Sequence, residues 1–239
     1  MGKMFDTGYN QRPVVEAGAC HRRKISAAGS SPTAARLRLE QFNAMQPPLE
    51  VEQKYRVPSL APLHQRLVAI QARRLADEEQ LDLYLQHPAR DFSISGEAFR
   101  LRRINGNAVI TYKGPRQEGP IKVRTEIELP LAEDTDGDWL EILERLGFRR
   151  VHTIRKHRSL YLWPKAAQPL SVMLDEVDGL GFFVELEVIV DHPNQLAQAQ
   201  ASIQNVALEL GLEVIETRSY LRQMLESKEQ SASSTTKSR

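Results

Sequence analysis

Cysteine is almost absent from this sequence, since Cys20 is the only one among 239 residues. A single cysteine excludes an intramolecular disulfide framework and a cysteine-based zinc cluster. It is also typical of proteins from a reducing compartment, where thiols stay reduced. We therefore expect a cytoplasmic protein in which Cys20 is an inert thiol.

Long apolar runs are also missing. The longest surrounds Val188-Ile189-Val190 and is interrupted by Glu187 and Asp191, so it falls short of the ~20 residues that a membrane-spanning helix needs. The amino terminus reads Met-Gly but carries Asp6 where an acylation signal requires Ser or Thr, and it has no apolar core of a secretory signal. We expect neither a membrane span nor a membrane partner.

Net charge is nearly absent as well, at +1 for the whole chain. The charge is unevenly distributed: residues 1–47 carry +4, residues 227–239 carry +2, and residues 48–226 carry −5. An acidic central region does not attract nucleic acid as a whole. We therefore expect no nucleic-acid partner.

The composition divides the chain into three parts. Residues 1–47 mix Gly, Ser, Ala, Pro and Arg without any period, which predicts a basic, disordered extension. An organelle transit peptide, or a true start at Met45, fits the same residues. Residues 227–239 are rich in Ser, Thr and Lys and resemble a flexible tail. One folded domain is expected over 48–226.

Within that domain, polar and apolar residues alternate with the period of two that is typical of strands with two different faces. In the first such segment, Glu50, Glu52 and Lys54 share one face, and Val51 and Tyr55 share the other. The same pattern occurs over 80–86, 99–102, 109–113, 123–129, 154–163 and 184–190. The Asn105-Gly106 pair predicts a hairpin turn.

Helices are fewer. We expect one over 59–71 with Ser59 as its N-cap, one over 136–146 ended by Gly147, one over 195–210 ended by Gly211, and a short one over 219–226. Their apolar stripes need apolar partners, and the apolar strand faces can provide them. The charged strand faces must then point the other way.

A charged strand face is usually the solvated side of an ordinary antiparallel sheet. Here, however, the charges form tight groups of one sign, such as Glu-x-Glu, Arg-x-Arg and Lys-x-Arg. A sheet of seven or eight such strands can also curl into a closed barrel whose interior these residues line. The predicted fold is therefore α+β, an antiparallel β-barrel with a charged interior and helices packed outside.

Buried charges need compensation, because an unpaired buried charge is costly. Clustered Lys and Arg require an anion with many oxygens, and paired carboxylates require a hard divalent cation such as Mg²⁺ or Mn²⁺. A metal-bound polyphosphate satisfies both needs at once. Since the sequence contains no glycine-rich phosphate loop, side chains rather than backbone amides are expected to hold the phosphates.

These segments also resemble a known family. Glu50-Val51-Glu52-Gln53-Lys54 is similar to the Glu-x-Glu-x-Lys opening strand of the CYTH superfamily, the triphosphate tunnel metalloenzymes. Further segments follow in the order of that family, and the set is closest to bacterial class IV adenylyl cyclases. The further segments are Gln80–Gln86 with its Asp-x-Tyr, Ala98–Arg102, Tyr112–Pro115, Thr153–Tyr161, Leu174–Glu187 and Arg218-Ser219-Tyr220.

The resemblance implies an eight-stranded antiparallel tunnel, two divalent ions and often a homodimer. Carried onto this chain, the metal ligands are Glu50, Glu52, Glu126, Glu185 and Glu187. The triphosphate-binding residues are Lys54, Arg100, Arg102, Lys113, Lys156 and Arg158, with Arg56 and Arg124 on the same faces. Asp175, Lys113 and Lys156 are the candidate catalytic residues. Asp175 either completes the metal set or positions the nucleophile.

Three functions fit these expectations. The first is an adenylate cyclase that converts ATP to cyclic AMP and pyrophosphate. The second is a triphosphatase that hydrolyses tripolyphosphate, thiamine triphosphate or a nucleoside triphosphate. The third is a non-catalytic module that binds polyphosphate or a nucleotide. The presence of both Glu50 and Glu52 favours catalysis over the third.

Overall fold

The computed structural model describes residues 48–236 apart from 118, 120, 165 and 167. The extension predicted over 1–47 lies outside the described residues. The strands are β1 Leu49–Val57, β2 Arg73–Gln86, β3 Ala98–Ile104, β4 Asn107–Lys113, β5 Lys122–Pro130, β6 Arg149–Leu162, β7 Leu170–Val177 and β8 Gly181–Val190. The helices are α2 Ala61–Ala69, α3 Phe92–Ser95, α4 Asp136–Arg145, α5 Leu196–Leu210 and α6 Tyr220–Thr236, with a 3₁₀ turn at Pro193–Gln195.

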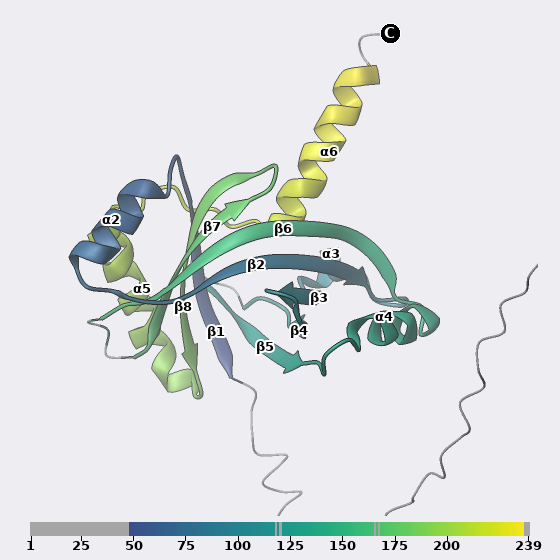
Figure 1. Cartoon of the computed structure of the whole chain (residues 1–239), viewed down its shortest axis with the longest axis horizontal. Coiled ribbons are helices and arrows are strands. Elements are labelled where there is room, and N and C mark those ends of the chain that lie inside the picture. The colour runs from purple at the N-terminus through teal and green to yellow at the C-terminus, as the bar shows by residue number, and fades with distance from the viewer. Residues whose placement is uncertain (1–47, 118, 120, 165, 167, 237–239) are drawn as a thin grey trace, which may run out of the picture. The chain divides into compact units, whose positions relative to one another are not determined.

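The eight strands form a closed antiparallel barrel in the order β1-β5-β4-β3-β2-β6-β7-β8 (Figure 1). The ring closes where β8 pairs with β1, with Glu52 opposite Glu187. A closed barrel has no free sheet edge, so every strand has a partner on both sides. The α+β barrel expected from the sequence is therefore confirmed.

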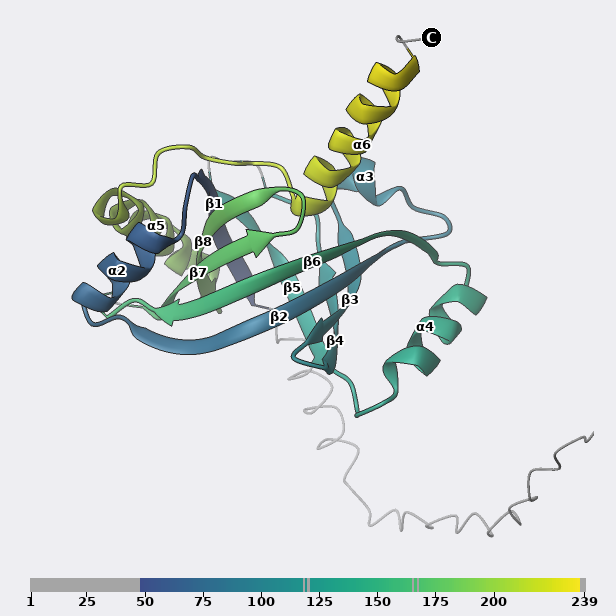
Figure 2. The same ribbon diagram turned by 45° about the horizontal axis from the view of Figure 1, so that its top comes forward.

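The main hydrophobic core lies outside the barrel wall. Val51, Val184 and Leu186 project outward from β1 and β8 and pack with Leu67 of α2 and Ile203 of α5. Both helices lie on the same side of the barrel (Figures 1 and 2). Because alternate strand residues point to opposite faces, this arrangement directs the charged residues between them into the barrel.

Local signals in the sequence explain several boundaries. Asn105 and Gly106 both have positive φ angles, at 48° and 92°, as the tight turn between β3 and β4 requires. Gly211 follows α5 in the left-handed conformation, with φ at 65°. The N-cap of α2 is Leu60 rather than Ser59, although the Ser59 hydroxyl accepts a hydrogen bond from the Ala61 N–H at 3.3 Å.

Three elements extend at least five residues beyond their expected ranges, and α3 and β7 were not indicated by the alternation or the capping signals. β2 begins at Arg73 rather than residue 80, and β6 at Arg149 rather than residue 154, so the two pair as long strands that reach towards α4 (Figure 2). α6 continues to Thr236, so residues 227–236, expected as tail, are helical. The short α3 is capped by Asp91, whose carboxylate accepts the Ser93 N–H at 2.9 Å. Among the described residues, no helix is long and apolar enough to cross a membrane.

Candidate active site

The interior of the barrel is a large cavity lined by charged side chains. Its volume is about 1260 Å³, and every strand contributes to its lining or to the charged groups behind it. On β1, Glu50 and Lys54 are only 1% and 2% exposed, yet they point towards this cavity rather than into the apolar core. The alternation read from the sequence therefore corresponds to an inner and an outer face.

Three carboxylates from three strands converge in the cavity. Glu50 of β1, Glu126 of β5 and Glu187 of β8 each offer an oxygen, and these oxygens lie within 4.8 Å of one another. Lys113 of β4 donates to Glu50 at 2.8 Å and to Glu126 at 2.9 Å. Carboxylate oxygens are the ligands that hard divalent cations prefer, so this cluster can hold a metal ion.

The charge balance in this cluster also favours a cation. Burial raises the pKa of Glu187 to about 7, because repulsion from Glu126 and Glu52 adds to it and Lys113 offsets only part. Burial likewise raises the pKa of Glu50 well above its usual value. At Glu126 the pKa falls instead to about 2, since Lys113 and Arg100 outweigh the effect of burial. Burial thus disfavours the ionised form of two of the three carboxylates.

Glu52 and Glu185, the other two predicted metal ligands, lie in the same cavity but pair with cations. Glu52 accepts a hydrogen bond from Lys122 at 2.8 Å. Glu185 accepts one from Arg158 at 2.5 Å. Neither belongs to the three-carboxylate cluster found among the described residues, so a second ion would have to displace these cations.

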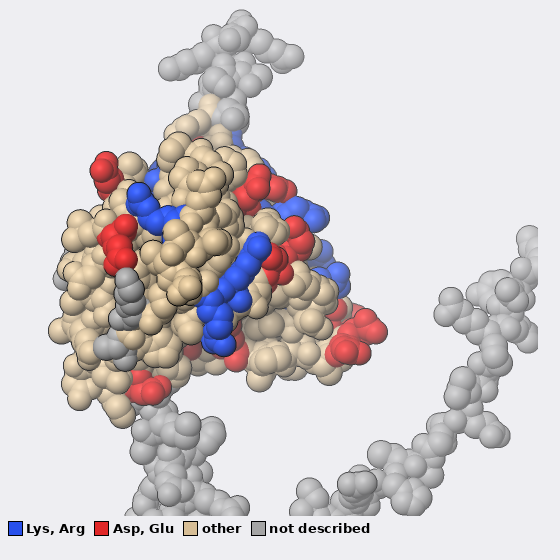
Figure 3. All heavy atoms as spheres, turned by 60° about the vertical axis from the view of Figure 1, so that its left-hand side comes forward, with Lys and Arg blue, Asp and Glu red and all other residues tan. Residues whose placement is uncertain are grey.

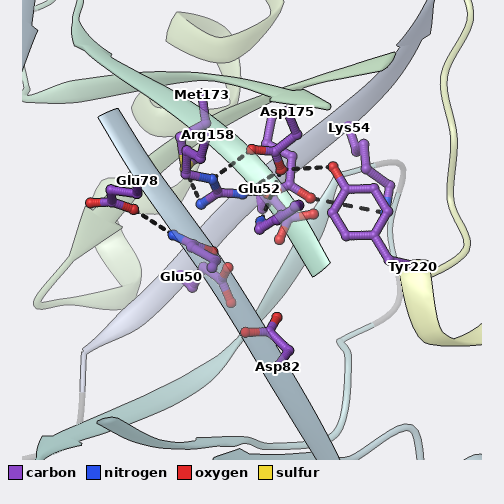
Figure 4. Close-up of polar contacts among 12 residues, drawn as sticks. Glu50, Glu52, Lys54, Glu78, Asp82, Arg158, Met173, Asp175 and Tyr220 are labelled. Carbon is purple, nitrogen blue, oxygen red and sulfur yellow. Dashed lines mark hydrogen bonds and ion pairs between the residues drawn. The ribbon is translucent and has the colours of Figure 1, made fainter. Parts of the chain in front are cut away.

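Asp175 of β7 is completely buried and is surrounded by donors. It accepts hydrogen bonds from Arg158 at 2.6 and 2.7 Å and from the Tyr220 hydroxyl at 2.9 Å (Figure 4). Lys156 donates a further one at 2.9 Å. Although burial opposes ionisation, Arg158 and Lys156 hold its pKa well below the usual value. Of the two roles that the sequence leaves open, these contacts favour positioning over metal binding.

The predicted phosphate-binding lysines and arginines line the cavity, with the exception of Arg56. Lys54, Arg100, Arg102, Lys113, Arg124, Lys156 and Arg158 all do so. Arg56 is exposed at the end of β1, where it donates to the Leu180 carbonyl at 2.9 Å and to Gln223 at 2.7 Å. It shares the phase of Lys54 but lies beyond the cavity lining.

Two of the cavity lysines have unusual acidity. Burial lowers the pKa of both Lys54 and Lys156 to about 8, and at Lys156 the nearby Arg158 adds to the effect. A lysine with such a pKa is partly deprotonated near neutral pH and can accept a proton. Both lysines therefore lose a proton more easily than an exposed lysine does.

Sequence reasoning assigned no role to Asp82 or Lys122. Asp82 of β2 accepts two hydrogen bonds from Arg102 at 2.6 and 2.8 Å and pairs with Arg100 at 3.3 Å. The sequence did contain a signal for Asp82, because Asp82 shares one face of the predicted strand with Gln80 and Tyr84. Lys122 precedes the clear part of its strand, and only the barrel places it opposite Glu52.

One end of the cavity carries apolar side chains beside the charges. Phe92 of α3, Phe99 of β3, and Leu221 and Leu225 of α6 line the same cavity as Tyr84. α3 and α6 lie next to each other in both views (Figures 1 and 2). The cavity lining therefore combines apolar and aromatic side chains with the charged ones.

Comparison with known proteins agrees with this geometry. The model of the CYTH domain family matches residues 48–220. A protein of Methanocaldococcus jannaschii named as a candidate adenylate cyclase is 31% identical over 175 residues, covering 72% of this chain and 97% of that protein. The adenylate cyclase CyaB of Aeromonas hydrophila is 29% identical over 177 residues, covering 72% and 86%.

A solved structure is similar in the same way. The PH1819 protein of Pyrococcus horikoshii superimposes with a TM-score of 0.67 and 37% identity, covering 74% of this chain and 99% of that one. The matched family model spans well over half of the chain and coincides with the barrel and its charged cavity. The chain belongs to the CYTH domain family.

Proposed function

We propose that this protein is a metal-dependent enzyme that binds a triphosphate inside the barrel and converts ATP to cyclic AMP and pyrophosphate. The observation that carries the proposal is the cavity itself, which places three convergent carboxylates beside rows of lysine and arginine. Such a pairing suits a metal-bound polyphosphate.

Glu50, Glu126 and Glu187 are the proposed ligands of a Mg²⁺ or Mn²⁺ ion. Their oxygens converge, and burial raises the pKa values of Glu50 and Glu187, so a bound cation would favour their ionised forms. Such an ion would supply Lewis acidity at phosphate oxygens and would lower the pKa of a bound hydroxyl. A second ion at Glu52 and Glu185 remains a prediction of the resemblance.

The basic side chains are proposed to hold the phosphates. Lys113 and Arg158 now donate to carboxylates and can turn to phosphate oxygens within the same cavity. The Nε atom of Arg100 is buried and has no hydrogen-bond partner among the described residues. A buried donor without a partner is costly, so an anionic ligand beside Arg100 would satisfy it.

In the proposed reaction, the ribose 3′-hydroxyl oxygen forms a bond to the α-phosphorus of ATP. The bond from that phosphorus to the bridging oxygen breaks, and pyrophosphate leaves with the electron pair. Lys156 in its neutral form accepts the hydroxyl proton, since its pKa is about 8. Asp175 holds Lys156 in place, and Lys113 and Arg158 stabilise the charge on the leaving group.

The apolar end of the cavity favours a nucleotide over bare polyphosphate. Phe92, Phe99, Leu221 and Leu225 offer aromatic and aliphatic surface on which a purine can pack. Two curated relatives are also named for adenylate cyclase activity. A cytoplasmic location and a homodimer remain predictions of the sequence and of the resemblance.

One assay separates the three candidate functions. The purified protein is incubated with ATP, and in parallel with tripolyphosphate, in the presence of Mg²⁺ or Mn²⁺, and the products are resolved by chromatography. Cyclic AMP and pyrophosphate in equal amounts would support the proposal. Orthophosphate release without cyclic AMP would replace it with a triphosphatase, and binding without turnover would leave a non-catalytic module.

A further inference from the structure

Lys54 differs from the other lysines of the cavity in how it is held. Lys113, Lys122 and Lys156 each donate to a carboxylate at 2.8 or 2.9 Å. Among the described residues, the nearest carboxylate paired with Lys54 is Glu185, whose oxygen is 3.9 Å away. Lys54 is nevertheless only 2% exposed, so this long ion pair leaves room for a second, closer contact to the buried ammonium.

The aromatic ring of Tyr220 fills that position. The Lys54 ammonium lies 3.9 Å from the centre of this ring (Figure 4), and the Lys156 ammonium lies 5.2 Å from it. A cation over an aromatic face at such a distance is attracted by the negative charge of the ring face. Tyr220 therefore attracts Lys54 without occupying its N–H donors.

The ring itself is fixed at two points. The hydroxyl of Tyr220 donates to Asp175 at 2.9 Å. The edge of the ring packs against Phe183, with the ring centres 5.0 Å apart and the planes inclined at 66°. Tyr220 is buried at the first turn of α6, so it presents a rigid surface to Lys54.

We propose that Tyr220 is a positioning residue that holds the Lys54 ammonium by its ring face, so that Lys54 reaches the triphosphate with its three N–H donors free. A lysine hydrogen-bonded to a carboxylate must exchange that partner for phosphate, whereas Lys54 has only the longer ion pair with Glu185 to give up. This inference rests on the proposed function, because it assumes that a triphosphate binds in the cavity.

The test uses imidotriphosphate, a tripolyphosphate with nitrogen bridges, together with Mg²⁺. Its dissociation constant is measured by titration calorimetry for the full chain and for Tyr220→Phe, Tyr220→Leu and Lys54→Met. The phenylalanine variant keeps the ring and should lose less than about threefold in affinity, whereas the leucine variant should lose about tenfold. Thermal melting checks that each variant is folded.

The affinity of the double variant Tyr220→Leu with Lys54→Met distinguishes a positioning role from a merely structural one. If Tyr220 acts through Lys54, the double variant binds no more weakly than Lys54→Met alone. Tyr84→Leu is the matched control, because Tyr84 lines the cavity but contacts Arg100. Its loss of affinity should add to that of Lys54→Met.

Two results would overturn the role of Tyr220 while leaving the proposed function intact. One is additive losses for Tyr220→Leu and Lys54→Met, and the other is equal losses for the phenylalanine and leucine variants, which would assign the effect to the hydroxyl. If the unaltered protein does not bind imidotriphosphate at all, the proposed function fails and the role of Tyr220 fails with it.

Discussion

Glu187 gives the barrel interior a pH dependence that runs against the usual behaviour of carboxylates. Its pKa in the folded protein is about 7, above the ordinary value of 4.5. The folded state therefore binds more protons than the unfolded state between these two pH values. In the metal-free protein, this residue's contribution to stability is complete below pH 4.5 and is lost as the pH rises to about 7.

Chemical denaturation in EDTA at pH 5 and pH 7 tests this expectation. The free energy of unfolding should be lower at pH 7, by about 1–3 kcal/mol. Glu187→Gln should flatten the dependence, and Mn²⁺ should reverse the loss by stabilising the ionised form. A stability that rises from pH 5 to pH 7 in EDTA and is unaffected by the substitution would contradict the assignment.

A substitution at Lys156 can distinguish an effect on catalysis from an effect on substrate binding. Lys156→Arg keeps the positive charge but cannot release its proton near neutral pH. We expect kcat to fall about 100-fold or more, with KM changed by less than about threefold. Lys122→Arg is the control, since Lys122 pairs with Glu52 and has no proposed role as a base. Retained kcat in Lys156→Arg would exclude Lys156 as the base.

At the scale of elements, β2 and β3 are joined inside the barrel by a buried ion pair. Asp82 and Arg102 lie directly opposite each other in the strand register and form two hydrogen bonds. Asp82→Asn removes the charge that compensates both Arg102 and the neighbouring Arg100. The free energy of unfolding should fall by about 3 kcal/mol, because an uncompensated charge remains buried.

The exposed ion pair of α4 is the control for that measurement. Glu141 and Arg145 are four residues apart on the surface of the helix, and both side chains are more than half exposed. Glu141→Gln should cost less than about 0.5 kcal/mol. Urea denaturation measures the free energy of unfolding of both variants. An equal decrease in the two would show that the barrel interior is as well solvated as the surface.

The elements with a clean alternation could be predicted from the sequence, and those without it could not. Residues 73–79 read Arg-Arg-Leu-Ala-Asp-Glu-Glu, so the first half of β2 shows no period of two and was missed. The sequence after Glu226 is polar and offers no apolar stripe, so the extension of α6 could not be predicted from it. The Asn105-Gly106 turn was predicted because its backbone geometry depends on two residues alone.

For the site, the sequence predicts which face a residue is on but not which residues meet. Glu50 and Glu52 have the same pattern, yet only Glu50 joins Glu126 and Glu187, while Glu52 pairs with Lys122. The difference comes from the stagger of strands around a closed barrel, which no single strand encodes. Arg56 lies two residues after Lys54, on the same face of the strand, but for the same reason it lies outside the cavity lining.

At the scale of the whole molecule, the barrel interior contains a dense group of charged side chains, whereas one outer face carries few. The face on the side of α2 and α5 is mostly uncharged, with charged side chains scattered across it (Figure 3). The interior instead contains both cationic side chains and carboxylates, whose charges cancel in the net charge of the chain. A net charge of +1 therefore conceals the feature on which the proposed function depends.

The amino-terminal boundary gives a prediction at the same scale. The compact unit that contains the barrel spans Gln46–Arg239. A chain that begins at Met45 should therefore melt at the same temperature and turn over ATP at the same rate as the full chain. Circular dichroism and the product assay check both, and an unfolded or inactive protein would assign residues 1–44 to the fold.

We propose that a metal-bound triphosphate occupies the barrel. Anomalous diffraction from crystals grown with Mn²⁺ and imidotriphosphate can locate both groups. We expect a manganese peak among the oxygens of Glu50, Glu126 and Glu187, with phosphate oxygens against Lys113 and Arg158. Manganese and phosphate bound only on the outer surface, with Lys113 still between Glu50 and Glu126, would contradict it.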